Sequence, residues 1–311
     1  MNSFIAIPIT LLFGLTLVLA LRTRLSGREW QIAFACFVVH TLGALAQVGI
    51  TSYFYGGGDM LQFHKIGQLL AEWVTYDPAN NLPLLIDLIL QRDVLLPIDV
   101  VGIGSSTGSI FGVAGLLGLI FGSSLVSVCF FMGYCSMASQ FAIFMAMRDR
   151  LAPRLHLRVF AGIALLPSTV FWTSGLLKES FALGGLGLMF LGAKKFVEDK
   201  GRLSGLTLLA LGVIPVAIMK SYILFPFAIS ASIWFYWHST VTSKKRLLLL
   251  TQPLYLVLGL LLAVGSLFLL GRYFPRFALE NMNQELSKIQ MMYQQGTQGG
   301  SSYAIAVPTS Q

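Results

Sequence analysis

SLVSVCFFMGYCSMASQFAIFMAMRDR, residues 124–150, is the stretch that decides the fold of this chain. Residues 124–147 contain no Asp, Glu, Lys or Arg, and Arg148 and Arg150 follow directly after them. A helix of about 20 apolar residues spans the hydrocarbon core of a bilayer. The stretch therefore predicts a transmembrane helix that ends in a basic turn, and similar patterns predict spans at roughly 3–21, 31–50, 159–177, 180–194, 203–219, 221–239 and 247–270.

The composition of the whole chain agrees with this pattern. Hydrophobic residues fill 56% of the 311 positions, charged residues fill 11%, and the mean hydropathy is +0.76. Soluble domains carry about 25% charged residues, so this chain has too little charge to cover a globular surface. We expect an all-α fold, a polytopic transmembrane helix bundle with about eight spans plus interfacial helices in an external loop.

Basic residues are concentrated in four hydrophilic gaps between the predicted spans. Fourteen of the 21 Lys and Arg lie in residues 22–28, 148–158, 194–202 and 244–246. Four acids accompany these 14 bases, namely Asp149, Glu198, Asp199 and Glu29, which directly follows the first gap. The gaps with Glu29 therefore have a net charge of +10, and the rest of the chain, with seven bases and nine acids, has a net charge of −2. The positive-inside rule places such gaps in the cytoplasm. The overall charge of +8 therefore needs no nucleic-acid partner to explain it.

The same rule predicts the topology. With the basic gaps inside, the N-terminus is external, and a long external loop, 51–123, follows the second span. Two spans within 109–147 would place Arg148 outside, so residues 109–122 are expected to form a half-inserted or interfacial helix. The first 21 residues lack a basic region ahead of their apolar run, which indicates a retained span and not a cleaved signal.

Two regions are expected along the chain. Residues 1–270 form the transmembrane bundle with its external loop, and 271–311 form an external amphipathic helix and a polar tail. Because the chain stops in a polar loop at Gln311, we expect the natural protein to continue.

Two other features bear on partners and ligands. Glycines line one face of the helix expected near 109–122, which predicts close packing against a neighbouring span or, alternatively, docking of another membrane protein; they are Gly108, Gly112, Gly115, Gly118 and Gly122. The three cysteines lie in apolar segments and the four histidines are scattered, so we expect no disulfide, no metal site and no cofactor.

The first candidate site follows the second span, where the chain reads YFYGGGDMLQFHK, residues 53–65. The glycines allow a tight turn, and Asp59 opens a helix whose apolar face is expected to lie on the bilayer surface. Asp59 is either the N-cap of this helix or a carboxylate that takes a proton from an attacking hydroxyl. His64 and Lys65 are candidates for binding substrate beside it.

The second candidate site lies where one predicted span ends outside and the next begins. Lys178 and Glu179 are expected at the membrane boundary, where ionisable groups are costly and are often functional or paired. Lys178 either binds a phosphate as a point charge or extends to the interface. Further candidates for binding an anionic head group on this side are Arg92, Lys220 and Tyr222.

This layout resembles the GT-C superfamily of membrane glycosyltransferases, which take sugars from polyprenyl-phosphate carriers. The resemblance rests on Gly58-Asp59 with Phe63-His64 and on residues 167–179, which look like a segment of bacterial proteins of polysaccharide assembly. It implies a bacterial inner-membrane enzyme with Asp59 as general base and with Lys178 and Arg92 on the leaving phosphate. Asp59 follows the second span and not the first, and no second acid adjoins it, so a metal is not implied.

Three functions stay open at this point. The first is transfer of sugar from a lipid-linked donor on the non-cytoplasmic face. The second is a non-catalytic membrane subunit that scaffolds a larger complex, which the glycine face and the amphipathic segment 275–295 favour. The third is transport of a lipid-linked sugar, although few ionisable residues lie within the predicted spans.

Overall fold

The computed structural model describes residues 3–198, 201–242 and 265. All regular structure in this part of the chain is helical, as expected, and it comprises eleven α-helices with short 3₁₀ and π-helical turns. The chain divides into two compact units. The first comprises Met1–Gly56 and Met60–Lys220, and the second comprises Gly57–Asp59 and Ser221–Gln311.

Four helical stretches of the described chain are long and apolar enough to cross a membrane: Gly27–Phe54, Leu125–Arg150, Lys178–Val197 and Arg202–Trp234. A fifth is present if a bent helix pair counts as one span, and two shorter apolar helices accompany them. Several spans, typical of a multi-pass membrane protein, are therefore present. The expected number of eight is not confirmed.

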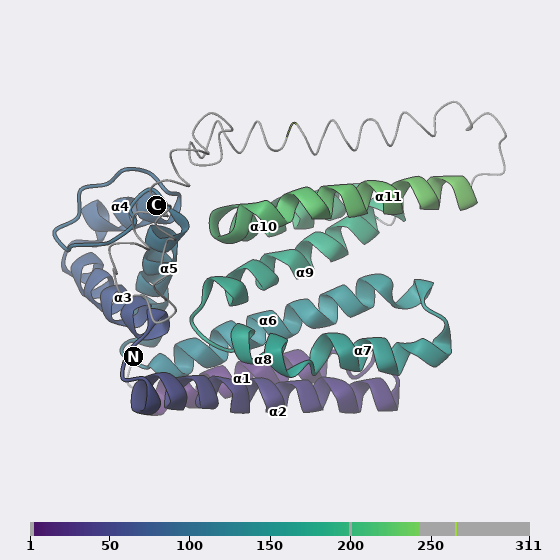
Figure 1. Cartoon of the computed structure of the whole chain (residues 1–311), viewed down its shortest axis with the longest axis horizontal. Coiled ribbons are helices and arrows are strands. Elements are labelled where there is room, and N and C mark those ends of the chain that lie inside the picture. The colour runs from purple at the N-terminus through teal and green to yellow at the C-terminus, as the bar shows by residue number, and fades with distance from the viewer. Residues whose placement is uncertain (1–2, 199–200, 243–264, 266–311) are drawn as a thin grey trace, which may run out of the picture. The chain divides into compact units, whose positions relative to one another are not determined.

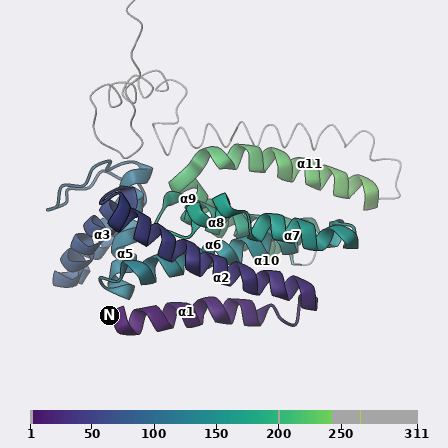
Figure 2. The ribbon, with the colours of Figure 1, turned by 60° about the horizontal axis from the view of Figure 1, so that its bottom comes forward.

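The first two helices are α1 (Ser3–Ala20) and α2 (Gly27–Gly49), which continues as a π-helical turn (Ile50–Phe54). They lie side by side and run in opposite directions (Figure 2). Between them, Ser26 and Glu29 form a capping box that satisfies free N–H groups at the start of α2. Large apolar side chains such as Phe4 (86% exposed) and Leu42 (58%) remain uncovered, as a lipid-facing surface requires.

The centre of the first unit is α6 (Leu125–Met147), which contacts α1, α2 and α9 (Lys178–Val197). Close packing of α6 with α9 and of α9 with α10 (Arg202–Lys220) depends on glycines. A Cβ at Gly187 would lie 2.5 Å from Ser139 Cα, and one at Gly212 would lie 2.5 Å from the carbonyl oxygen of Gly185. Such small residues allow helix backbones to approach each other within a membrane.

The predicted span 159–177 is broken. It consists of α7 (His156–Ala164) and α8 (Pro167–Thr173), which the structure bends by 43°. Pro167 explains the break, since proline supplies no N–H and its ring disfavours helical backbone at the preceding residue. The pair follows α2 along its length: His156 lies 3.4 Å from Glu29 near the start of α2, and the Phe171 carbonyl lies 2.6 Å from Gln47 near its end.

Three shorter helices, α3 (Asp59–Tyr76), α4 (Pro78–Ile89) and α5 (Ser106–Phe121), are gathered at one end of the long helices of the first unit (Figure 1). The apolar face of α3 packs against α5, where the rings of Phe63 and Phe111 lie 5.2 Å apart. The glycine face of α5 is used for this packing, since a Cβ at Gly118 would lie 3.0 Å from Ala71 on α3. A Cβ at Gly112 would likewise lie 2.5 Å from Ile89 on α4. The apolar face of α3 was expected to lie on the bilayer surface, but Phe63 on that face is buried against protein.

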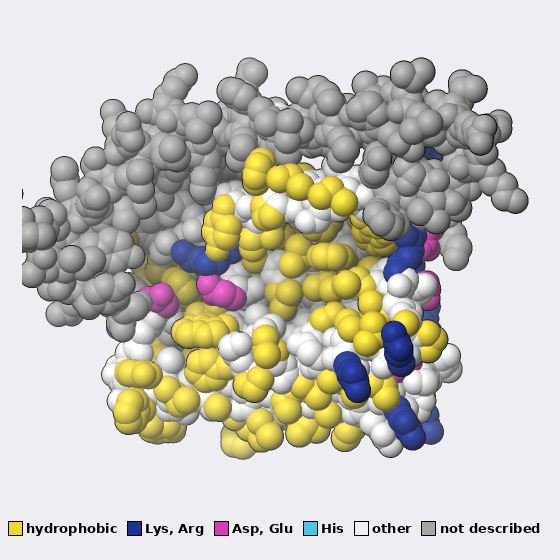
Figure 3. Space-filling model, turned by 45° about the vertical axis from the view of Figure 1, so that its right-hand side comes forward, with side chains coloured by type: hydrophobic (Ala, Val, Ile, Leu, Met, Phe, Trp, Pro, Cys, Tyr) yellow, Lys and Arg dark blue, Asp and Glu magenta, His cyan; other side chains and the backbone are white. Residues whose placement is uncertain are grey.

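Three of the four basic gaps meet at the opposite end of these helices. Arg148 donates to the carbonyl oxygen of Arg24 (3.1 Å), and Lys194 lies 2.6 Å from Asp149. On the face in Figure 3, Lys and Arg side chains gather mainly at one end, and hydrophobic side chains cover much of the remaining described surface. The fourth gap, 244–246, lies outside the described residues.

Among its described residues, the second unit contains a 3₁₀ turn (Ser221–Ile223) and α11 (Leu224–Thr242). It also includes Asp59, the first residue of α3. The 3₁₀ turn coincides with the turn predicted between the spans 203–219 and 221–239, but the helical stretch Arg202–Trp234, counted as one candidate span, runs through it. The predicted span 247–270 and the amphipathic segment 275–295 lie outside the described residues, apart from Gly265, which is helical.

Two glycines on α9 provide a matched test of this packing. Gly187→Ala forces a methyl group against the α6 backbone at Ser139, whereas the space beside Gly184 is open to 4 Å. We expect Gly187→Ala to destabilise the protein by about 1–3 kcal/mol through overpacking and Gly184→Ala to be neutral or slightly stabilising. Thermal unfolding in detergent measures both. Equal melting temperatures for the two variants would contradict this packing.

Candidate functional site

The outer candidate site is built around Lys178, the first residue of α9. Its Nζ donates to Thr107 Oγ1 (2.9 Å) and Ser106 Oγ (3.3 Å) in the first turn of α5. The start of α5 is fixed by Ser105, whose hydroxyl accepts from the backbone N–H of Thr107. Two helix N-termini, which carry partial positive charge, therefore meet at a lysine.

Lys178 and Glu179 do not form the charge pair that their adjacency indicates. Glu179 instead forms an ion pair with Lys220 at the end of α10, with 2.8 Å between the charged atoms. Two residues before Lys220, the carbonyl oxygen of Ile218 accepts a hydrogen bond from Gln91 Nε2 (2.6 Å). The structure thus brings the starts of α5 and α9, the end of α10 and the chain after α4 together. We call Lys178, Glu179, Lys220, Ser106 and Thr107 the outer cluster.

Asp59 is the first residue of α3 and has an exposed side chain. It follows Gly58, whose φ of +126° favours glycine. An acid in the first turn of a helix interacts favourably with the helix dipole, and exposure leaves the carboxylate accessible to a ligand. Neither a capping bond nor an ion pair joins Asp59 to the part of the chain that the structure describes.

The other predicted residues have separate environments. Arg92 is paired with Asp87 at 2.7 Å and its side chain is 66% exposed. Lys65 and Tyr222 are exposed, and Tyr222 belongs to the second unit. His64 is half-buried, with Nε2 3.3 Å from the Ser123 carbonyl oxygen. Burial lowers the pKa of His64, and the hydrogen bond to Ser123 opposes this only in part, so His64 brings no positive charge for a phosphate at neutral pH.

The structure also contains a buried polar stripe that the sequence reasoning missed. It lies on one face of α2 and consists of Glu29, Cys36, His40 and Gln47, each at most 3% exposed. Polar groups buried at membrane depth need hydrogen-bond partners, and α7 and α8 supply them. Cys36 Sγ donates to the carbonyl oxygen of Ala164 (3.1 Å), and Gln47 Nε2 donates to that of Phe171 (2.6 Å).

Ala164 is the last residue of α7, beside the break, and Phe171 lies in the last turn of α8. Backbone oxygens in the last turn of a helix lack a full set of partners within the helix. The stripe therefore stabilises the broken span. Its signal was present in the sequence, because residues 29, 36, 40 and 47 recur at helical spacing within an otherwise apolar segment.

The middle of the stripe is a three-residue network around His40. Its Nδ1 lies 2.9 Å from Ser174 Oγ on one side, and Nε2 lies 3.0 Å from the side-chain amide of Gln140 on the other. Ser174 Oγ donates its one hydrogen to the Val170 carbonyl oxygen (2.6 Å), so it accepts from Nδ1–H of His40. A neutral His40 then accepts at Nε2. A half-turn of the Gln140 amide would present its N–H₂ group, otherwise without a partner, to that nitrogen.

At the basic end, Glu29 anchors the stripe. Arg148 binds both of its carboxylate oxygens, with Nη2 at 2.7 Å and Nε at 3.0 Å. This bidentate geometry is the strongest form of carboxylate recognition. It ties the start of α2 to the end of α6.

A double-mutant cycle tests the His40 network. His40→Leu leaves the buried amide of Gln140 with little to bond, and Gln140→Met leaves His40 Nε2 without its partner. Each single change is expected to cost about 1–3 kcal/mol, and the double change less than their sum, because it removes both polar partners. Unfolding in detergent measures the three variants. Additive losses would show that the two side chains do not interact.

The lowered pKa of His64 predicts a local pH dependence. Protonation is harder in the folded protein, so docking of α3 is most stable above the ordinary pKa of 6.5 and weakens as the pH falls below it. Hydrogen exchange of residues 59–76, corrected for intrinsic rates, should therefore show less protection at pH 5.5 than at pH 7.5. His64→Gln should remove the difference. An unchanged difference in that variant would assign it to another group.

Comparison with protein-family models, with curated proteins and with solved structures found no match for this chain. Function is therefore inferred from the residues and contacts described above.

Proposed function

We propose that this protein is a membrane glycosyltransferase-like enzyme of a bacterial inner membrane. In this proposal the chain crosses the bilayer about eight times and transfers a sugar from a polyprenyl-phosphate carrier on the non-cytoplasmic face. The observation that carries the proposal is the position of Lys178, whose ammonium group lies between the first turns of α5 and α9 and donates to two hydroxyl groups.

A phosphate group suits this position for two physical reasons. Helix N-termini present free N–H groups and partial positive charge to an anion, and two such termini meet here. Hydroxyl groups and an ammonium group can all donate hydrogen bonds to phosphate oxygens. Glu179 is neutralised by Lys220 at 2.8 Å, so its negative charge opposes an incoming phosphate less.

The outer end also fits a lipid-borne substrate. Tyr53, Phe54 and Tyr55, at the end of α2, are 91%, 79% and 70% exposed. Aromatic side chains of this kind are enriched where a membrane meets water. A polyprenyl chain would remain in the bilayer while its phosphate reaches the outer cluster.

The proposed reaction assigns Asp59 as general base. An acceptor hydroxyl attacks the anomeric carbon of the sugar, its proton passes to the Asp59 carboxylate, and the bond from the anomeric carbon to the phosphate oxygen breaks. The polyprenyl phosphate leaves with the electron pair of that bond, held by Lys178 and Arg92. The exposed carboxylate of Asp59 supports this role, because a base must reach the proton that it accepts.

The scaffold alternative loses one of its two supports. Glycines 108, 112, 115 and 118 of α5 lie against α3, α4 and the loop that precedes α5. This face is occupied within the chain and is not open to another protein. The second support, the segment 275–295, lies outside the described residues.

Binding of a lipid phosphate tests the role of Lys178. We expect Lys178→Gln to weaken binding of polyprenyl phosphate in detergent micelles at least tenfold, since a charge-assisted hydrogen bond contributes about 1.5–3 kcal/mol. Arg158→Gln, which removes one exposed positive charge from the basic end, should leave binding unchanged. Native mass spectrometry measures bound lipid in each variant. Equal binding by the parent protein and Lys178→Gln would rule out Lys178 as the phosphate ligand.

Transfer activity tests the role of Asp59. Asp59→Asn keeps the size of the side chain and removes its basicity, so transfer from a panel of radiolabelled polyprenyl-phosphate sugars should fall by at least about 10²-fold. Insertion and thermal unfolding should match the parent protein, because the side chain is exposed. Full activity in the variant would eliminate Asp59 as the base. Loss of the outer-cluster phosphate site in the same variant would point to binding instead.

A further inference from the structure

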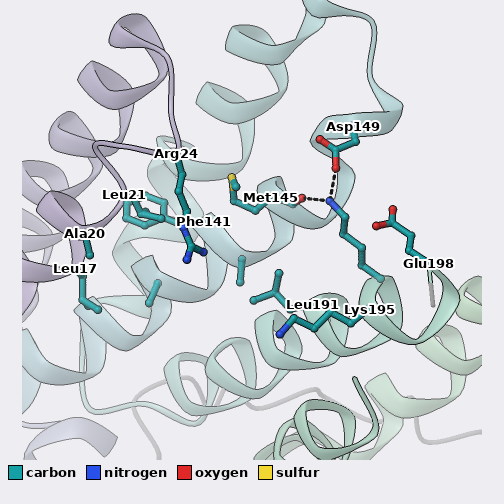
Figure 4. A pocket seen from close by; sticks show the side chains of 13 residues that line it. Leu17, Ala20, Leu21, Arg24, Phe141, Met145, Asp149, Leu191, Lys195 and Glu198 are labelled. Carbon is teal, nitrogen blue, oxygen red and sulfur yellow. Dashed lines mark hydrogen bonds and ion pairs between the residues drawn. The ribbon is translucent and has the colours of Figure 1, made fainter. Parts of the chain in front are cut away.

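A pocket opens at the basic end of the first unit, between the last turns of α1, α6 and α9, roughly 20–30 Å along α9 from Lys178. Its volume is about 550 Å³, within the range of sites for small ligands. Figure 4 shows side chains from all three helices lining it. The wall contains Leu17, Phe141 and Leu191, and the mouth contains Arg24, Lys194 and Lys195.

The charges at the mouth do not cancel. Asp149 is engaged by Lys194 at 2.6 Å, and Glu198 is paired with Arg150 at 3.6 Å. Arg24 and Lys195, in contrast, have exposed side chains that form no ion pair within the described chain. In Figure 4 the two side chains extend toward the same space, Arg24 from the turn after α1 and Lys195 from α9. Two positive charges are thus available to an anion there.

The interior of the pocket is apolar at the depth where a lipid tail would lie. Leu191 precedes Lys195 by about one helical turn, and Leu17 lies on the membrane side of Arg24 in α1. A ligand that satisfied both parts would carry a negative group at the mouth and a hydrocarbon chain inside. Basic pockets between transmembrane helices on the cytoplasmic side recognise lipids of this kind.

We propose that this pocket binds an anionic phospholipid of the surrounding leaflet, with its phosphate between Arg24 and Lys195 and part of an acyl chain along Leu17 and Leu191. The site is separate from the outer cluster, and neither depends on the other. Basic residues gather at the inner ends of spans for topology alone, but topology requires no apolar pocket between them. The pocket is therefore the feature that the experiment must test.

The test uses the purified full chain in detergent and native mass spectrometry with phosphatidylglycerol and phosphatidylcholine. The parent protein is expected to retain phosphatidylglycerol in preference to phosphatidylcholine. Arg24→Gln/Lys195→Gln should lower phosphatidylglycerol affinity by roughly tenfold or more. Arg154→Gln/Arg158→Gln removes the same charge at the same end but outside the pocket lining, and should leave the affinity unchanged.

A second variant separates the pocket from general charge. Ala138→Trp places a large side chain in the lining and keeps every charge, so it should reduce phosphatidylglycerol binding as strongly as the charge variant. Thermal unfolding without added lipid shows whether each variant is folded. If Ala138→Trp proves unstable, Ala142→Leu, a smaller addition to the same lining, should lower phosphatidylglycerol binding instead.

Three results would overturn the proposal. Loss of binding in the control pair Arg154→Gln/Arg158→Gln as well would show a general charge effect. A folded Ala138→Trp variant with parental affinity would place the lipid outside the pocket. Displacement of the lipid by millimolar inorganic phosphate would identify a site for free phosphate and not for a lipid.

Discussion

The structure depends on one constraint: a backbone that breaks its helix inside a membrane must find hydrogen-bond partners within the protein. Pro167 separates α7 from α8, and one carbonyl in the last turn of each of these short helices is bonded by a side chain of α2. Cys36 and Gln47 donate to these two carbonyls at 3.1 and 2.6 Å. The buried stripe on α2 is therefore explained first by the broken span beside it.

This constraint also separates the two ends of the bundle. Because α7 and α8 follow α2 from Glu29 to Gln47, the chain enters α7 beside the basic turns and leaves α8 at the other end, where Lys178 begins α9. The 20 residues of α9 extend about 30 Å, so the outer cluster and the basic pocket lie at its opposite ends. At the outer end, Lys178 lies at the starts of α5 and α9. At the basic end, Lys194 and Lys195 line an apolar pocket.

Much of this arrangement was predictable from sequence, because apolar length and basic gaps are local signals. The helices near 3–21, 31–50 and 124–147 agree with α1, α2 and α6. What local signals do not contain is the partner. The sequence around Gly112 does not predict that Ile89 packs against it. Similarly, Glu179 pairs with Lys220, 41 positions away, and not with its neighbour Lys178. His40 was passed over because its partners, Ser174 and Gln140, come from distant helices.

The most direct test of these two ends is labelling across an intact membrane. Single cysteines would replace exposed Arg154 and the 42%-exposed Glu179 in a chain whose native cysteines are changed to serine. An impermeant thiol reagent should label position 179 only from outside and position 154 only from inside, because α7 and α8 cross between them. Labelling of both positions from the same side would show that the bent pair turns back, and would contradict the separation of the outer cluster from the basic pocket.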